Sequence, residues 1–162
     1  MKQTGKEERL SHHGSDCQHI RLDPMKRALN RQDLPRFYQF KHISAFTLDW
    51  SPDGKFLSLT LFQDGNAEIY ILNLRNKNLT RLTNHYSIDT ESSWSPKGSK
   101  IIFTSGRSGS PQIYELNLKR SNSKPKRLTF DGNYNAKGSY LPDNDGIIFV
   151  HRENSNFQIA IK

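Results

Sequence analysis

The stretch W-S-P-K-G at residues 94–98, followed by I-I-F at residues 101–103, is the clearest indication of the fold. It repeats W-S-P-D-G at residues 50–54, which lies 44 residues earlier, and a weaker copy begins at Tyr140, 46 residues later. In each full copy, proline presets φ for the second turn position and glycine accepts a positive φ at the exit of the turn. Each copy therefore predicts a strand, a tight turn and a second strand.

The second half of the unit repeats as well. E-I-Y-I-L-N-L at residues 68–74 matches Q-I-Y-E-L-N-L at residues 112–118, and R-L-T follows at residues 81–83 and again at residues 127–129. The third strand of a copy should be apolar on both faces, with Ile113 on one face and Tyr114, Leu116 and Leu118 on the other, which suits a strand between two sheets. Units of roughly 40–45 residues with four strands each are typical of propeller blades.

We therefore predict an all-β fold, a partial β-propeller of about two and a half four-stranded blades. The blades should span about residues 43–86, 87–132 and 133–162, the last of them incomplete. Residues 1–42 match no blade, and we expect a polar, basic, poorly ordered segment with one short helix that starts at Asp23 and Pro24 and stops before Pro35. The structural motif of the blade is carried by Trp50, Pro52, Asp53, Gly54, Tyr70, Trp94, Pro96, Gly98 and Tyr114.

Composition excludes several classes of protein. The chain has 162 residues, a formal charge of +8 and only 33% hydrophobic residues. No nucleic-acid-binding motif accompanies this charge, so we interpret it as a Lys/Arg-rich surface and expect no nucleic-acid partner. Cys17 is the only cysteine, so no internal disulfide can form. No run of 18 apolar residues predicts insertion into a membrane, and the polar first 30 residues carry no secretory signal as they stand.

The sequence predicts no catalytic, cofactor or metal site. His12, His13, Cys17 and His19 fit no closed zinc pattern, so a solvated tail is favoured over metal binding. Residues 143–146, D-N-D-G, are predicted to form a hairpin turn, since the spacing of a calcium loop is absent. Residues 106–109 lack the strand-to-helix context of a nucleophile elbow. We therefore expect a protein that is not an enzyme and has no cofactor.

Recurring aromatic and basic residues are interpreted as structural. We expect Trp50, Trp94, Tyr70 and Tyr114 to pack between blades rather than form an exposed binding surface. Arg81 and Arg127 are expected to make a salt bridge or a cation–π contact with the next blade.

Three longer stretches carry a family resemblance. They are D-T-E-S-S-W-S-P at residues 89–96, F-T-S-G-R-S-G-S-P-Q-I-Y at residues 103–114 and R-L-T-F-D-G-N-Y-N-A at residues 127–136. With them, residues 43–162 resemble the propeller of the TolB family of the Tol–Pal envelope system, built from WD40-like (PD40) repeats. That family has six blades and a separate N-terminal α/β domain after a signal peptide, so the resemblance is to a fragment.

The resemblance implies a periplasmic, non-enzymatic scaffold. Such a protein contacts the peptidoglycan-associated lipoprotein Pal and other Tol components, and it serves outer-membrane integrity and protein import. In that family the loops that lead into the blades face the lipoprotein, which makes Thr90 and Glu91 the predicted partner contacts here, with Phe46 and Ala136 at the equivalent offset in the flanking copies.

Two alternatives stay open at this point. The chain could be the propeller of a prolyl-oligopeptidase-like hydrolase without its catalytic domain, or a non-functional gene remnant. Two and a half blades cannot close a ring, and an open array exposes its end sheets, so we expect the isolated chain to be marginally stable or prone to aggregation.

Overall fold

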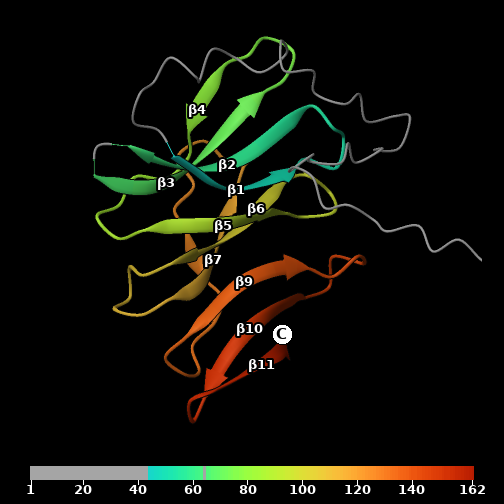
Figure 1. The fold of residues 1–162 in the computed structure, drawn as a ribbon. Helices are drawn as coiled ribbons and strands as arrows, with labels where there is room; N and C mark the ends of the chain where they lie inside the picture. Colours follow the sequence, from blue (N-terminus) through green and yellow to red (C-terminus); the bar gives the residue numbers. More distant parts are fainter. Residues whose placement is uncertain (1–43, 64) are drawn as a thin grey trace, which may run out of the picture.

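The computed structural model describes residues 44–63 and 65–162, and the regular structure in this part is entirely β (Figure 1). Its strands form three antiparallel sheets in which consecutive strands are neighbours. The first sheet contains β1 (Ser44–Trp50), β2 (Phe56–Gln63), β3 (Asn66–Asn73) and β4 (Leu79–Arg81). The second contains β5 (Asp89–Trp94), β6 (Lys100–Ser105), β7 (Gln112–Asn117) and β8 (Lys126–Arg127), and the third contains β9 (Asn135–Tyr140), β10 (Ile147–Glu153) and β11 (Asn156–Ile161).

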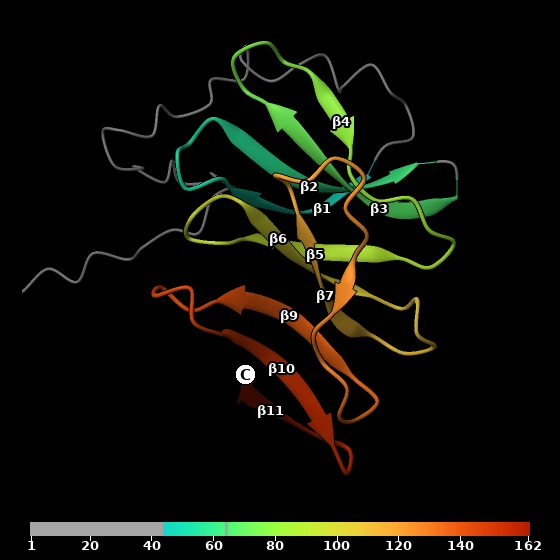
Figure 2. The ribbon, with the colours of Figure 1, turned by 180° about the vertical axis from the view of Figure 1, so that it is seen from behind.

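The three sheets are stacked face to face in chain order, as both views show (Figures 1 and 2). Their first strands form a row, because β1 packs beside β5 and β5 beside β9. This arrangement confirms the predicted partial propeller, with two four-stranded sheets and a third of three strands. No helix long and apolar enough to cross a membrane occurs among the described residues. The predicted short helix after Asp23 lies outside them.

The turn after each first strand follows the predicted chemistry. In the first copy, Asp53 Oδ1 accepts hydrogen bonds from Ser51 Oγ at 2.7 Å and from the Lys55 backbone N–H at 3.1 Å. Gly54 and Gly98 both have a positive φ, of 67° and 64°. The third copy has no glycine at this position, and Asn144 takes it with a φ of 66°. Asparagine tolerates this left-handed conformation better than most residues, so the turn survives the substitution.

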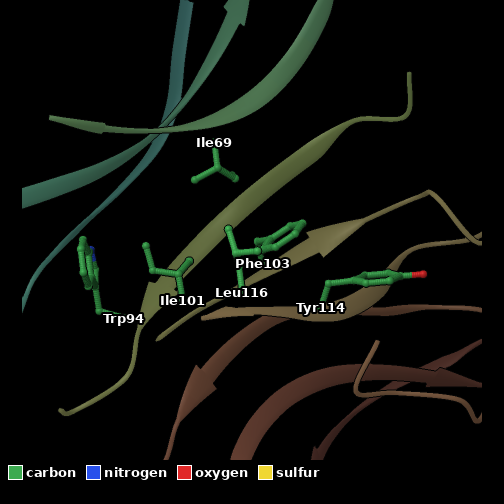
Figure 3. Close-up of a cluster of buried hydrophobic side chains, with 6 residues drawn as sticks. All are labelled: Ile69, Trp94, Ile101, Phe103, Tyr114 and Leu116. Carbon is green, nitrogen blue, oxygen red and sulfur yellow. The ribbon is translucent and has the colours of Figure 1, made fainter. Parts of the chain in front are cut away.

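A hydrophobic cluster lies between the first two sheets. Figure 3 shows its buried members, which are Ile69, Trp94, Ile101, Phe103, Tyr114 and Leu116. Ile113, on the opposite face of β7, packs in a second cluster with Ile102, Ile147 and Phe149, between sheets two and three. The prediction that the third strand is apolar on both faces is therefore confirmed. Trp94 is buried as predicted, while Trp50 is half-buried at the margin of a cluster in the first sheet.

Buried polar side chains join each third strand to the residues that directly follow the fourth strand. Thr83 Oγ1 donates to Glu68 Oε2 at 2.5 Å, and Thr129 Oγ1 donates to Gln112 Oε1 at 2.8 Å in the next copy. In both sheets the threonine hydroxyl also accepts a backbone N–H from the third strand. The repeated R-L-T motif thus fastens the short outer strand of each blade.

The expectation that the two arginines reach the next blade is wrong. Arg81 pairs with Glu68 of its own sheet at 3.0 Å, because that carboxylate lies beside it on β3. The guanidinium of Arg127 lies 5.0 Å from the ring centroid of Phe130, in the loop directly after its own strand. Both arginines therefore act within a blade and its outgoing loop.

The outer face of the third sheet is open in the described structure. Ile159 on β11 occupies the position that Ile69 and Ile113 hold in the first two sheets, where each is fully buried by the following sheet. Ile159 is 67% exposed, and no described strand stacks on it. The stacking of blades, and not the sequence of the strand itself, decides how deeply this position is buried.

Candidate protein-binding rim

Antiparallel strands divide the loops of the molecule between two opposite ends of the sheets. One end carries the loops that lead into β5 and β9, at residues 82–88 and 128–134, together with the turns between the second and third strands. We call this end the loop rim. The opposite end carries the proline-containing turns that follow the first strands, and we call it the turn rim.

Each first strand contains a β-bulge close to the loop rim. In β5 the register shifts between Thr90 and Ser93, and Glu91 adopts a φ of 56°. In β9 the shift falls in the same place, and Lys137 adopts a φ of 53°. A bulge places two residues opposite one and redirects their side chains, so these residues project differently from those of a regular strand.

Hydrogen bonds across the bulges tie the three sheets to one another. The Glu91 backbone N–H donates to Thr47 Oγ1 of the first sheet at 3.2 Å. The Glu91 carboxylate accepts from Thr104 Oγ1 at 2.9 Å and from the Lys137 backbone N–H of the third sheet at 3.0 Å. Glu91 is therefore a link between all three sheets.

The structure gathers the predicted contact residues at the same end of the first strands. Thr90 and Glu91 are half-buried in β5, and Ala136 is buried in β9. Phe46 lies at the bulge of β1, but its side chain is outside what the structure describes. Because the Ala136 side chain is buried, only its backbone could meet a partner. Contact through Thr90 and Glu91 stays a prediction.

Sequence reasoning missed several exposed apolar side chains of the loop rim. Tyr86 is 86% exposed, Ile88 56% and Phe130 63%. The rings of His85 and Tyr86 lie 4.2 Å apart, and Lys162 Nζ lies 5.3 Å from the ring of Phe130. The sequence did hold a signal for these residues. They are apolar, yet they lie in loops after a complete R-L-T strand, where no core position is expected.

A buried ion pair anchors the loop rim in the second sheet. Asp89 is fully buried, and its Oδ2 lies 2.6 Å from a guanidinium nitrogen of Arg107. Arg107 in turn lies over the rings of Phe103 and Tyr114, at 5.4 and 5.0 Å. Burial raises the pKa of Asp89, although hydrogen bonds from Ser105 and Arg107 oppose the shift. Asp89 Oδ1 has no hydrogen-bond partner among the described residues.

The described residues contain no group of three or more histidine, cysteine, aspartate or glutamate side chains that could hold a metal ion. The stretch that contains His12, His13, Cys17 and His19 lies outside them. What the loop rim offers chemically is an aromatic and aliphatic surface beside threonine, carboxylate and ammonium groups.

Comparison with known proteins adds a sequence match and several structural ones. A family model described as the TolB beta propeller domain matches residues 27–162, so the match begins before the first predicted blade. The crystal structure of TolB from Acinetobacter baumannii is similar with a TM-score of 0.69 and 43% identity, over 76% of this chain and 30% of that one. A putative TolB from Agrobacterium tumefaciens gives a TM-score of 0.65 and 25% identity, over 75% of this chain and 45% of that one.

A more distant structural match comes from an enzyme. A structure from a study of two prolyl endopeptidases has a TM-score of 0.57 and 14% identity, over 74% of this chain and 20% of that one. At this identity the likeness concerns the fold alone. The chain spans less than half the length of either TolB structure.

Proposed function

The chain belongs to the TolB β-propeller family, and from that membership we propose that it is a non-enzymatic scaffold that binds a protein partner through its loop rim. One observation carries the proposal. Tyr86, Ile88 and Phe130 expose large apolar surfaces on the two loops that lead into first strands. The predicted contacts Thr90 and Glu91 are the second and third residues of the strand that directly follows one of these loops.

The chemistry of this surface suits protein recognition. Protein interfaces are enriched in aromatic residues at their centre and carry polar groups at their margin. Here Tyr86 and Phe130 supply the aromatic part, while Lys137 in β9 and Lys162 directly after β11 are exposed cations. A partner with an apolar patch flanked by carboxylates would complement this surface.

Family membership supports the identity of the partner and the compartment. We propose that the chain acts in the periplasm, where the peptidoglycan-associated lipoprotein Pal and other Tol components are its partners. The functions that follow, outer-membrane integrity and protein import, belong to a complete Tol–Pal system, and this chain spans 30% of the length of the Acinetobacter baumannii protein. The hydrolase alternative is supported by fold alone, since the prolyl endopeptidase match has 14% identity.

A titration of the full 162-residue chain with the purified periplasmic domain of Pal tests this proposal. We expect Tyr86→Ser and Thr90→Arg each to weaken binding by about tenfold, which corresponds to about 1.4 kcal/mol at a contact near the centre of an interface. Thr90→Arg is preferred to a change of Glu91, because the Glu91 carboxylate also links the sheets.

Arg120→Ser provides the matched control, because this exposed side chain lies in the loop between β7 and β8 at the opposite rim. It should leave the affinity unchanged. If the wild-type chain does not bind Pal, the proposed partner is wrong. Equal affinities for the wild type and both loop-rim variants would instead show that binding occurs elsewhere.

A further inference from the structure

The third sheet has an open edge at β11, which is the outermost strand of the stack in both views (Figures 1 and 2). The strand order β11-β10-β9 gives β11 a neighbour on one side only, whereas β3 and β7 are each paired with a fourth strand. The side chains of Phe157, Ile159 and Ile161 on β11 are 62%, 67% and 67% exposed. This edge runs along a strand, whereas the loop rim lies across the strand ends, so the inference drawn from it does not depend on the function proposed for that rim.

The corresponding edges of the first two sheets are protected in ways that β11 is not. The strand β4 contains three residues and β8 contains two, and they carry Arg81, Lys126 and Arg127. Short length and basic side chains are common means by which proteins prevent pairing at the edge of a sheet. The strand β11 contains six residues, N-F-Q-I-A-I, and none of them is charged. Its edge therefore has the properties of one that accepts another strand.

The backbone N–H and C=O groups of Ile159 point toward the open edge. In an antiparallel pair, residues that exchange both hydrogen bonds with the partner strand alternate with residues that exchange neither. Lys162 exchanges both with Ile147, at 2.9 and 2.8 Å. The register between β10 and β11 is unbroken, so Ile159, three positions before Lys162, is a residue of the other kind. Its N–H and C=O groups therefore face away from β10.

The second sheet shows how these groups are paired when a fourth strand is present. There Ile113 holds the position of Ile159, and its C=O group accepts the Leu128 N–H at 2.8 Å. The Ile113 N–H donates to Thr129 Oγ1 at 2.9 Å, and that hydroxyl donates to Gln112 Oε1 at 2.8 Å. The same three hydrogen bonds recur in the first sheet, where they join Ile69 and Glu68 to Leu82 and Thr83.

The strand β11 presents the same three recognition groups at its open edge. Ile159 supplies the backbone N–H and C=O, and Gln158 stands at the position of Gln112. Gln158 is exposed, and its Nε2 atom donates to Glu153 Oε2 at 3.2 Å. Its Oε1 atom can accept the hydroxyl of a threonine, as Gln112 Oε1 does. The edge of β11 is therefore chemically suited to a leucine–threonine pair.

A cavity of about 340 Å³ beside β11 provides room for the residue that precedes this pair. Ala160 lines the cavity and stands at the position that Tyr114 holds in β7. The fourth-strand residue opposite Tyr114 is Arg127, and residues directly opposite each other share one face of a sheet. A side chain opposite Ala160 would therefore lie on the side of the cavity, where the exposed Asp131 on its wall can pair with a basic group.

We propose that β11 accepts an extended segment of a partner protein as the fourth strand of the third sheet, and that this segment carries the sequence Arg-Leu-Thr. The leucine N–H donates to the Ile159 C=O. The threonine Oγ1 accepts the Ile159 N–H and donates to Gln158 Oε1, and the arginine lies opposite Ala160. Main-chain hydrogen bonds give such an added strand its affinity, and side-chain contacts give it specificity. The R-L-T segments of a second copy are paired within their own sheets, so the partner is a different protein.

A synthetic peptide with residues 124–131 of this chain, K-P-K-R-L-T-F-D, provides the test when it is added to the full chain labelled with ¹⁵N-isoleucine. Ile159→Val identifies the Ile159 amide signal by removing it from the spectrum. We expect the peptide to move this signal downfield, because the N–H gains a hydrogen bond. The same peptide with Thr129→Val loses both hydroxyl contacts and should bind about tenfold more weakly.

Two substitutions of the exposed Gln158 form a matched pair in the chain itself. Gln158→Met removes the acceptor and should weaken binding of the peptide about fivefold. Gln158→Glu should retain binding, because Glu68 accepts the threonine hydroxyl in the first sheet.

The proposal is overturned if the Ile159 signal does not move at the highest soluble concentration of the peptide, or if the peptide with Thr129→Val binds as tightly. Equal binding to Gln158→Met and to the wild type would also overturn it. So would an Ile159 signal that changes with the concentration of the chain alone, because a second copy would then occupy the edge.

Discussion

Asp89 and Asn135 occupy the same position, the first residue of a first strand, yet their surroundings differ. Asn135 Nδ2 donates to Gln112 Oε1 at 2.8 Å and to the Asp131 carbonyl at 2.7 Å, and its Oδ1 lies 2.7 Å from His151 Nδ1. Asp89 is equally buried but leaves Oδ1 without a partner among the described residues. The second blade therefore holds a buried acid where the third holds a fully paired amide.

Asp89→Asn is predicted to change how stability depends on pH. Burial raises the folded-state pKa of Asp89, so between its unfolded value near 4 and the higher folded value the native state binds more protons than the unfolded state. The stability from this group is fully present below about pH 4 and is lost as pH rises through the folded pKa. The free energy of unfolding of the wild type, relative to Asp89→Asn, should therefore fall as the pH rises from about 4 through the folded-state pKa.

Urea unfolding at several pH values measures this difference, with Asp145→Asn as a control at an exposed acid. The change of stability with pH should be larger for Asp89→Asn than for this control, because Asp89 is buried and Asp145 is exposed. If the difference in free energy of unfolding between the wild type and Asp89→Asn did not change with pH, the pKa of Asp89 would be the same in the folded and unfolded states.

Gly98 tests the turn chemistry at a single residue. Its φ of 64° is unfavourable for a residue with a Cβ atom, so Gly98→Ala should lower the free energy of unfolding by about 1 kcal/mol. Gly98→Asn should cost less, because Asn144 already holds the same conformation in the third copy. Chemical denaturation gives the free energy of unfolding of both variants. If alanine were tolerated as well as asparagine, the assignment of the turn would be contradicted.

Within a strand, burial depends on the neighbouring sheets, because a following sheet covers the side chains on one face of the third strand. Ile113 on β7 is fully buried between the second and third sheets, whereas Ile159 on β11 has the same place in its own strand and is 67% exposed. The two positions are a matched pair with the same side chain in the same strand position. A following sheet covers Ile113 but not Ile159, and β7 also has β8 beside it, whereas β11 is the edge of its sheet.

Ile113→Ala should lower the free energy of unfolding by about 2–5 kcal/mol, the usual cost of removing a buried isoleucine side chain. Ile159→Ala should change it by no more than about 0.5 kcal/mol, as exposed substitutions do. Thermal or urea unfolding of the two variants gives both values. A large loss at Ile159 would show that the outer face of the third sheet is covered in solution.

The elements themselves were largely predictable from the sequence, because their signals are local. A turn proline, a positive-φ glycine and a run of apolar residues such as 101–103 fix a hairpin within about ten residues. The role of Glu91 was not predictable, because the partners of its carboxylate include a backbone N–H 46 residues away. The burial of Ala136 likewise depends on how the sheets pack. The ion pair of Arg81 within its own sheet depends on how the strands pair. No local sequence pattern encodes either of them.

At the scale of the whole molecule, the three stacked sheets separate two surfaces with different chemistry. The loop rim exposes Tyr86, Ile88 and Phe130, while the turn rim carries a cavity beside Trp94. The candidate site was only partly predictable, since Thr90 and Glu91 came from family resemblance and the exposed aromatic residues were missed. Exposure is decided by the fold, and a loop sequence alone does not indicate which of its apolar side chains lack neighbours.

Hydrogen–deuterium exchange of the full chain, alone and with saturating Pal, locates the surface that binds the partner. Pal should slow exchange in residues 82–91 and 128–137, which form the loop rim and the start of the strands that follow it. Exchange in the turn segments 51–55 and 95–99 should stay unchanged. Protection confined to those turn segments, or no protection anywhere along the chain, would contradict a protein-binding role for the loop rim.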